Sequence, residues 1–316
     1  MMTLSLATRN LLRNRRRSMA TLLALAIGAT SVLLFGGYSA DIRYSLLTGY
    51  VQTGGHLQIQ HKDFFLFGNG NPTSYGIAGY AKLIDAIRQD AQLKTEVRVV
   101  SPTLQFGGLA GNYEAGVSRT VIGVGYVAAD VARMREWNEY GIPPISTPYA
   151  LTKASDDAAI VGIGVARVLL LCDKLQVPNC PKPSAEKKVA TGEALPADIA
   201  DLAAGEKPAA DGKGGKAQIE LLATQPKGSP NVTSVKVVAA EDQGFKELDE
   251  VTVILQLGQA QRLVYSKGEP RATSIMVQLE HSSAIAPVTK RLREILNATM
   301  PGHSLDVLDF KQLNPF

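Results

Sequence analysis

Cysteine, histidine and tryptophan are scarce in this chain of 316 residues, with two, four and one of them respectively. The histidines, at positions 56, 61, 281 and 303, do not show the spacing of metal ligands, and two thiols cannot fill a zinc shell. No nucleophile motif such as Gly-x-Ser-x-Gly occurs either. The sequence therefore predicts no metal site, no cofactor and no catalytic residue.

Acidic residues are absent from the first 17 positions, where five arginines gather. They are Arg9, Arg13, Arg15, Arg16 and Arg17. Without these five charges the formal net charge of +4 becomes −1 for the rest of the chain. A body of that charge disfavours a protein that tracks nucleic acid. The 45% of apolar and 20% of charged residues are those of a globular protein and exclude wholesale disorder.

Charged residues are also absent from Ser18 to Ala40. A helical run of about 20 residues reaches about 30 Å, the thickness of the hydrocarbon core of a bilayer. We therefore predict a transmembrane helix over 18–40, whose preceding arginines hold the N-terminus in the cytoplasm. Residues 1–17 are predicted to form a basic amphipathic segment on the membrane surface, and an irregular basic tail is the alternative.

A cleaved export signal is the rival interpretation of this segment. Its apolar stretch would normally be about 7–15 residues, which is shorter than the run found here. Cleavage after Ala40 would also place Tyr38 where a small side chain is required. Arg16 and Arg17 before the run faintly resemble a twin-arginine signal. We prefer a retained anchor.

Two β-α-β patterns lie at opposite ends of the part that follows the span. Each combines strands of alternating apolar residues with a helix that has one apolar stripe. The predicted elements are strands 55–60, 97–104 and 118–127 with a helix over 80–91, and strands 273–279 and 304–308 with a helix over 285–296. The two patterns can pair into one α/β subdomain, made of 50–127 and 268–316, only if everything between them is an insertion.

The middle of the chain, 128–267, is then an inserted β-rich subdomain, with predicted strands over 218–222, 233–238 and 251–257. No Phe, Tyr or Trp occurs between Tyr149 and Phe245. Residues 181–216 have no apolar periodicity, so we predict a long mobile loop there. The fold class is α+β: a transmembrane helix followed by a core of two β-α-β units with a β-rich insertion.

The two cysteines, Cys172 and Cys180, fall on the side of the membrane that the arginines assign as external. An oxidising compartment would let them form a disulfide at the base of the predicted loop, where it would restrict the unfolded chain. Two free thiols are the alternative. The prediction depends on the compartment rather than on the spacing of the pair.

The stretch Val161-Gly-Ile-Gly-Val-Ala-Arg167 imitates a dinucleotide-binding fingerprint. Such a unit needs an acidic residue about 20 positions later, and that neighbourhood holds Lys182 in the proline-rich segment. A tight turn between a strand and a helix is therefore the better interpretation. Gly212–Lys216 lacks the spacing and the final Ser or Thr of a phosphate-binding loop, so no ATPase site is predicted in this chain.

An apolar cluster, Phe64, Phe65, Leu66 and Phe67, lies beside a loop rich in glycine and asparagine. It is a candidate contact surface for a lipid, lipoprotein, peptide or drug. Ordinary packing in the core or at a sheet edge is the alternative, because short apolar runs are usually buried.

Seven stretches carry a further signal: Leu6–Ser18, Gly54–Gln60, Ile122–Gly125, Ile160–Ala166, Ile219–Leu222, Phe245–Asp249 and Leu308–Phe316. In their order and spacing they resemble the permease subunits of the MacB/FtsX/lipoprotein-release type of ABC transporter, across nearly the whole chain. The resemblance implies a periplasmic core with a β-α-β "porter" half, made from both chain ends, and an inserted β-rich half.

The same resemblance implies a function. The chain would be a non-catalytic permease component of the bacterial inner membrane, whose periplasmic domain relays conformational change from a separate ATPase. Implied partners are that ATPase, a second permease subunit in a homodimer or heterodimer, membrane lipid, and a periplasmic adaptor or lipoprotein. The transported substrate is not identified.

The family pattern continues with three more membrane helices, whereas this sequence stops at Phe316. The expectation is therefore either a fragment of a longer permease or a protein that works with one span. Two other classes of function stay open. One is a single-span periplasmic binding module without ATP coupling, and the other is a secreted enzyme, which the lack of a polar catalytic cluster disfavours.

Overall fold

The computed structural model describes residues 9, 13–68, 70–142, 148–180, 217–226 and 228–313. Most of the predicted membrane-surface segment, the predicted mobile loop over 181–216 and the last three residues lie outside the described residues. The chain divides into two compact units. Met1–Tyr50 and Asn138–Pro143 form the first, and Val51–Trp137 with Pro144–Phe316 forms the second.

The first unit is dominated by α2, a helix of 40 residues over Arg15–Gly54. Its most apolar window of 18 residues has a mean hydropathy of 2.0, and none of that window is buried. The helix continues past Ala40, where we predicted the span to end, because no proline interrupts it before the glycine pair at 54–55. At about 1.5 Å per residue it is about 60 Å long, roughly twice the apolar thickness of a bilayer.

A short segment of the first unit packs on α2 through aromatic rings. Tyr140 stacks on Tyr44 with ring centroids 4.6 Å apart. The guanidinium of Arg43 lies 5.4 Å from the centroid of the Tyr44 ring. Within the segment, the side-chain amide of Asn138 donates to the carbonyl of Ile142 at 2.7 Å. The stack of Tyr140 on Tyr44 therefore holds residues 138–142 against the helix.

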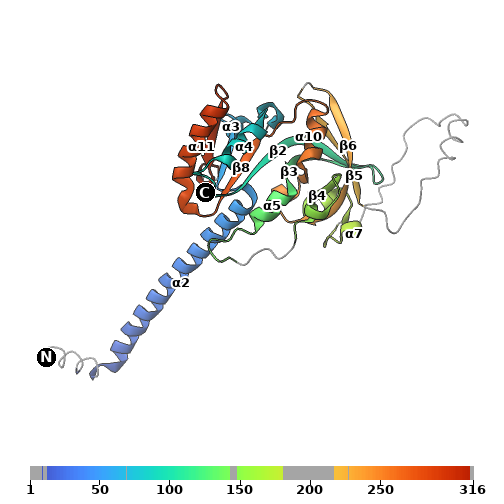
Figure 1. Ribbon diagram of the computed structural model, residues 1–316. Helices are drawn as coiled ribbons and strands as arrows, with labels where there is room; N and C mark the ends of the chain where they lie inside the picture. The colour runs from blue at the N-terminus through green and yellow to red at the C-terminus, as the bar shows by residue number, and fades with distance from the viewer. Residues whose placement is uncertain are drawn as a thin grey trace, which may run out of the picture. The chain divides into compact units, whose positions relative to one another are not determined.

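The second unit contains the two predicted β-α-β patterns, interleaved in one antiparallel sheet of order β2-β8-β1-β9. The elements are β1 (Leu57–His61), α4 (Tyr80–Gln89) and β2 (Val97–Asn112), then β8 (Ser274–Leu279), α11 (Ile285–Thr299) and β9 (Leu305–Asp309). Figure 1 shows α4 and α11 side by side against these strands. Leu57, Ile59 and Val277 are buried in one core with Leu83 and Leu292 of the helices. The predicted alternation placed these strand residues on one face.

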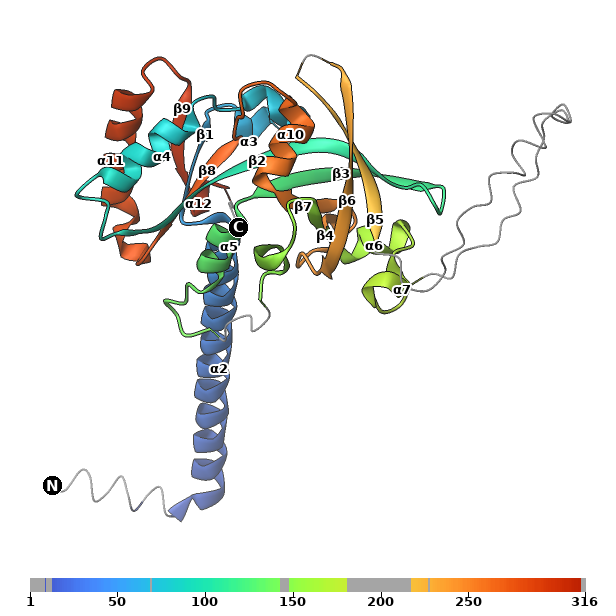
Figure 2. The same cartoon turned by 45° about the vertical axis from the view of Figure 1, so that its right-hand side comes forward.

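Six strand segments form a closed barrel beside this sheet (Figure 2). The ring runs from the second part of β2 through β3 (Val117–Tyr126), β7 (Thr252–Gln256), β4 (Ala158–Gly162), β6 (Pro230–Glu241) and β5 (Gln218–Thr224) back to β2. The helices α6 (Ile163–Val168) and α10 (Leu257–Tyr265) contribute to its apolar core. Short elements complete the described chain: α3 (Phe64–Phe67), η1 (Pro72–Tyr75), α5 (Ala128–Arg135), η2 (Ala150–Lys153), α7 (Cys172–Leu175), α9 (Lys246–Asp249), η3 (Ser282–Ala284) and α12 (Phe310–Leu313).

The barrel differs from the division that the sequence suggested. We grouped 50–127 with the α/β subdomain, but β3 pairs only with the barrel strands β2 and β7. The two sheets part within β2, since Val97–Thr103 pairs with β8 and Leu104–Asn112 pairs with β3. A strand of 16 residues is long enough to serve both sheets, so they share one compact unit.

The barrel is built from two similar halves that exchange strands. The first half is β2-β3-α5-β4-α6 and the second is β5-β6-α9-β7-α10. β3 pairs in parallel with β7 of the second half, and β6 pairs in parallel with β4 of the first. The antiparallel contacts between the halves centre on Ala110 with Leu221 and on Ile160 with Ile254. The sequence carries a weak trace of this repeat, Ile160-Val-Gly-Ile-Gly-Val-Ala166 beside Ile254-Leu-Gln-Leu-Gly-Gln-Ala260.

Candidate functional site

The face of the α/β sheet opposite its two helices carries buried polar side chains. Strand residues alternate between faces, so Gln60, Ser101 and Gln278 lie on the face away from Leu57 and Val277. All three are buried, and Gln278 has no exposed surface. A buried polar side chain is costly unless it is hydrogen-bonded, so the partners of Gln278 indicate what this face does.

Gln278 binds the last turn of α2 and the end of α5 at once. Its side-chain amide nitrogen donates to the carbonyl of Val51 at 3.1 Å and to the carbonyl of Met134 at 3.0 Å. The side chain of Gln52, also buried, donates to the carbonyl of Trp137 at 2.8 Å. The carbonyls at a helix C-terminus have no partner within the helix, and here side chains and the following backbone supply partners.

Trp137 and His56 complete this cluster. The indole Nε1–H of Trp137 donates to the carbonyl of Glu280 at 3.0 Å, and its ring meets the edge of the His56 ring at 4.9 Å between centroids. The main-chain N–H of Leu279 donates to Nδ1 of His56 at 3.0 Å. Nδ1 therefore carries no proton, and in the neutral ring the proton lies on Nε2, which is 3.3 Å from Oγ of Ser282.

Gly55 makes the short connection between α2 and β1 possible. Its φ is +76°, and its N–H donates to the carbonyl of Val51 at 3.1 Å, as in a left-handed helix cap. A Cβ at this position would lie 2.9 Å from the carbonyl oxygen of Val277. Only glycine meets both requirements, which explains the Gly-Gly-His sequence at 54–56.

We call the set Val51, Gln52, His56, Met134, Trp137 and Gln278 the junction. Its hydrogen bonds join side chains to main-chain groups of α2, α5 and β8, and each of these residues is buried. Such an arrangement fixes the end of the long helix to the strand and helix beside it.

The sequence analysis did not single out the junction. His56 was assigned to a strand without a role, and Trp137 and Gln278 carried no motif. The available signal was the pair of glycines before a histidine, followed by glutamines that alternate with Leu57 and Ile59 on a strand. Partners separated by more than 80 residues cannot be read from such local patterns.

The residues that we did predict lie in three separate places. Each of the five arginines is exposed, at or before the start of α2. Cys172 and Cys180 are paired as a disulfide with their Cα atoms 6.1 Å apart, in and after α7. The pairing inside the proposed compartment stays a prediction. The structure brings neither group to the junction.

The apolar cluster Phe64–Phe67 forms α3, which has no buried residue. Phe64 packs edge-on against Tyr75 with ring centroids 5.9 Å apart, while Leu66 and Phe67 are 69% and 65% exposed. Core packing therefore does not account for these last two residues. A contact role for them stays a prediction.

The glycine-rich turn at Val161–Ala166 connects β4 to α6 and packs against α9. A Cβ on Gly162 would lie within contact distance of the carbonyl oxygen of Asp249, and one on Gly164 would lie 2.8 Å from Cα of Glu250. The two glycines are thus required for a close approach of two backbones. This agrees with the interpretation of the motif as a tight turn.

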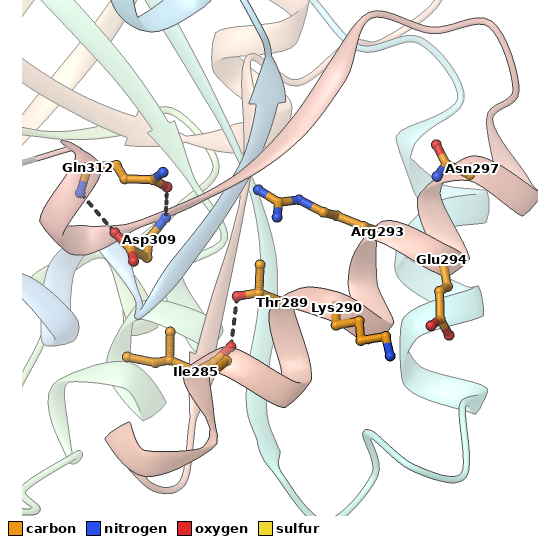
Figure 3. A pocket seen from close by; sticks show the side chains of 9 residues that line it. Ile285, Thr289, Lys290, Arg293, Glu294, Asn297, Asp309 and Gln312 are labelled. Carbon is orange, nitrogen blue, oxygen red and sulfur yellow. Dashed lines mark hydrogen bonds between the residues drawn. The ribbon is translucent and has the colours of Figure 1, made fainter.

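A groove of about 550 Å³ lies between α11 and the segment of β9 and α12 (Figure 3). β9 pairs with β1 on one side and has no partner strand on the other among the described residues. Its outward main-chain groups are bonded to side chains: the N–H of Val307 to Asp306 at 2.7 Å, the carbonyl of Val307 to Arg293 at 3.1 Å, and the N–H of Asp309 to Gln312 at 3.0 Å. The groove is therefore bordered by a strand edge that is already satisfied.

The pKa values of Asp90 and Tyr149, both outside the junction, are shifted from their ordinary values. The guanidinium of Arg291 lies 2.8 Å from Asp90, and this hydrogen bond lowers the pKa of that carboxyl group. Burial raises the pKa of Tyr149 well above its ordinary value, and neighbouring Arg135 opposes the rise. The Arg135 guanidinium lies 4.3 Å from the Tyr149 ring centroid and 2.8 Å from Glu241. In the described part of the chain no three His, Cys, Asp or Glu side chains group as metal ligands.

No protein-family model matches the chain, and no curated protein matches it. Solved structures similar to it include the extracellular domain of the noncanonic ABC-type transporter YknZ from Gram-positive bacteria, at 12% identity and a TM-score of 0.41 over 80% of this chain and 99% of that one. Another is the periplasmic region of MacB from Actinobacillus actinomycetemcomitans, at 10% identity and a TM-score of 0.43 over 82% and 91% of the two chains. At such identities and TM-scores, function has to be argued from the chain's own residues.

Proposed function

We propose that this chain is a membrane-anchored permease component of an ABC transporter of the export or lipoprotein-release type. Its N-terminus would lie in the cytoplasm and its second unit in the periplasm. One observation carries the proposal: an exposed apolar helix that begins among arginines ends in a buried, hydrogen-bonded junction. The stretches that resemble such permeases include both ends of this helix, Leu6–Ser18 and Gly54–Gln60.

The junction supports a relay of movement from the membrane to the external domain. An unbroken helix transmits a displacement of its first turn to its last turn with little loss. Val51 and Gln52 in that last turn are hydrogen-bonded to β8 and to the end of α5. Because packed interfaces respond to strain as units, a shift of the helix end would move those two elements with it.

The partners follow from the same proposal. ATP would be hydrolysed by a separate ATPase subunit, and two permease subunits, identical or different, would act together. Membrane lipid would surround α2, while a periplasmic adaptor or lipoprotein would meet the second unit. A single-span binding module without ATP coupling is the second candidate, and the exposed residues Leu66 and Phe67 of α3 favour it.

Coupling to an ATPase separates the two candidates. The full chain would be cross-linked in cells, extracted in mild detergent and assayed for vanadate-sensitive ATP hydrolysis by the isolated complex. We expect such an activity for the wild type. We expect Gln278→Leu, which breaks the junction, to change the hydrolysis rate by about fivefold or more, as typical coupling free energies imply.

Gln225→Leu is the matched control, because Gln225 binds the exposed Ser266 far from the junction in the sequence. It should leave the rate unchanged. If no ATP-hydrolysing subunit accompanies the chain, the binding-module proposal replaces this one. If it does but both glutamine variants behave alike, the permease assignment stands and the relay through the junction is wrong.

A further inference from the structure

A small cavity in the second unit has a strongly basic lining. Its volume is about 250 Å³, and it lies where the end of α4, the following turn, the start of β2 and α5 meet. Four of its lining residues are cationic: Arg88, Lys94, Arg98 and Arg133. Asp130 is the one acidic residue among those that line it.

A β-bulge places one of these cations. Val97 pairs with Leu279 and Val99 pairs with Gln278, so Arg98 is the extra residue between them. Bulges redirect a side chain out of the regular alternation. The Arg98 guanidinium reaches Glu136 at 3.3 Å and Glu280 at 3.4 Å, while its buried Nε–H has no hydrogen-bond partner among the described residues.

The other three cations have no carboxylate within ion-pair distance in the described part of the chain. Arg88 donates to the carbonyl of Val100 at 3.0 Å, and Arg133 donates to the carbonyl of Arg98 at 3.4 Å. These bonds orient the guanidinium groups but do not neutralise them, since a carbonyl carries no net charge. Lys94 has no ion pair at all in the described residues.

Apart from Asp130 in the lining itself, the nearby carboxylates are engaged elsewhere. Asp90, which follows α4, is bound to Arg291 at 2.8 Å. Glu136 and Glu280 share the single guanidinium of Arg98. With Asp130 as the one acidic residue of the lining against Arg88, Lys94 and Arg133, the cavity keeps a net positive charge. That charge favours an anion with several acceptor atoms.

We propose that this cavity binds a phosphate group, either free or as the phosphodiester of an anionic lipid headgroup. Phosphate offers several strong acceptors to the forked donors of arginine and to the point charge of lysine. Arg98 also lines the cavity, with its guanidinium bound to Glu136 and Glu280. The proposal goes beyond the transporter assignment and does not depend on it.

The test measures anion binding by the full chain in a neutral detergent, using isothermal titration calorimetry. One arm uses inorganic phosphate, and the other uses a short-chain phosphatidylglycerol below its micelle concentration. We expect saturable binding in at least one arm, weakened by added salt because the site is open to solvent. Binding of the lipid alone assigns the headgroup as the source, and binding of phosphate assigns the free anion.

The double variant Lys94→Gln/Arg133→Gln should bind the same probe at least about tenfold more weakly, since it removes two charged donors. Lys94→Arg keeps the charge and should bind like the wild type. Lys246→Gln/Lys290→Gln removes two charges outside the cavity and serves as the matched control. An unchanged emission maximum of Trp137 would verify the fold of each variant.

Two results would overturn the proposal. One is a wild-type chain that shows no saturable binding of either probe. The other is a cavity variant and a control variant that bind equally well, which would reduce the effect to the overall charge of the protein. Neither result bears on the ATPase coupling, so a failure here leaves the proposed function standing.

Discussion

Gln278 is the residue on which the junction depends most directly. Replacing it by leucine removes two donors and leaves the carbonyls of Val51 and Met134 buried without those partners. Each carbonyl keeps one main-chain donor, from Gly55 and Trp137 respectively, so the variant loses two hydrogen bonds but leaves neither carbonyl unpaired. Since a hydrogen bond contributes about 0.5–1.5 kcal/mol, we expect Gln278→Leu to lower the free energy of unfolding by about 1–2 kcal/mol. Denaturant titration of the full chain in detergent measures the change.

Trp137 gives that experiment a local readout. It is the one tryptophan in the sequence, it is 2% exposed, and its neighbour His56 also belongs to the junction. Loosening of the junction should shift its emission to longer wavelength before global unfolding. Gln225 makes an exposed hydrogen bond with Ser266. Gln225→Leu should therefore change the free energy of unfolding by no more than about 0.5 kcal/mol, and it should leave the emission maximum of Trp137 unchanged.

Two tyrosines, the buried Tyr149 and the half-buried Tyr265, predict a loss of stability in alkali. Burial raises the pKa of Tyr265 to about 12 and raises that of Tyr149 as well. An unfolded tyrosine ionises near pH 10. The unfolded chain therefore loses its protons first, so the contribution of Tyr265 is complete below about pH 10 and is lost as the pH rises towards about 12.

Tyr149→Phe isolates one part of this effect. The Tyr149 hydroxyl is buried without a hydrogen-bond partner among the described residues, so its removal should raise stability by about 1 kcal/mol at neutral pH. The variant should also show a shallower alkaline decline than the wild type, followed by unfolding curves and tyrosinate absorbance. Equal alkaline slopes in both proteins would contradict the assignment.

Residue by residue, the sequence analysis succeeded where chemistry is local. Alternation on Leu57 and Ile59 identified a core face, and the glycines at 162 and 164 were interpreted as a turn. His56, Trp137 and Gln278 escaped it because their partners are distant in sequence. A glutamine on a strand gives no local sign of which carbonyls it will bind.

The two strand-to-helix turns of the barrel halves offer a matched comparison at the level of elements. Gly164 is the second residue of α6, and Gly258 is the second residue of α10. A Cβ on Gly164 would lie 2.8 Å from Cα of Glu250, whereas one on Gly258 would meet only the end of the Arg262 side chain at 3.6 Å. The same substitution should therefore have opposite effects at the two positions.

We expect Gly164→Ala to destabilise the protein by about 1–3 kcal/mol through overpacking. Gly258→Ala should be neutral or stabilise it by up to about 1 kcal/mol, since alanine favours the helix. Thermal unfolding of the two variants measures the difference. Similar effects at both positions would show that the backbone at the end of α9 can move away to make room for the added methyl group.

The edge of β9 predicts a second effect at this scale. Arg293→Ala with Gln312→Ala would release the carbonyl of Val307 and the N–H of Asp309. Exposed strand edges pair with other strands, so we expect concentration-dependent self-association, measured by sedimentation velocity. Lys290→Ala changes the same groove without touching the strand edge and should remain like the wild type. A double variant that does not associate would mean that something else protects the edge.

Outside the long helix, periodicity alone predicts most of the strands and both helices of the α/β sheet, but neither α5 nor α10. The helix expected over 80–91 is α4, and the one expected over 285–296 is α11 with three more residues. β2 was the main failure, since it runs eight residues past the predicted end. In the barrel, Gly108 lies so near the carbonyl oxygen of Leu222 that a Cβ would be 2.6 Å from it.

For the whole molecule, the arginines before α2 predict its orientation in a membrane. Reversing Arg13, Arg15, Arg16 and Arg17 to Glu should invert a large share of the chains, because positive charge favours the cytoplasmic side. Cys172 and Cys180, after reduction, report the side on which the second unit lies. An impermeant maleimide should label the wild type in intact spheroplasts and the variant only after permeabilisation.

The quadruple Arg→Lys variant keeps the charge and is the control for this experiment. It should be labelled like the wild type. Equal labelling of the Glu variant from outside would show that these arginines do not set the topology. Labelling of the wild type without prior reduction would show instead that the two thiols are free.

The organisation of the whole chain was only partly accessible from its sequence. The interleaving of two distant β-α-β patterns followed from the order of elements. The closed barrel did not, because closure depends on strand pairs such as Ile122 with Thr252, and on a strand shared by two sheets. Local patterns define what a strand buries but not which distant strand lies beside it.

The exchange of strands between the barrel halves has a consequence for the time order of synthesis. Chains emerge from the ribosome N-terminus first, so α2 is complete while most of its partners do not yet exist. β3 must wait for β7 to be made, and Gln278, which binds the last turn of the helix, comes later still. The last turn of α2 is thus made well before Gln278, the residue that fixes it to β8.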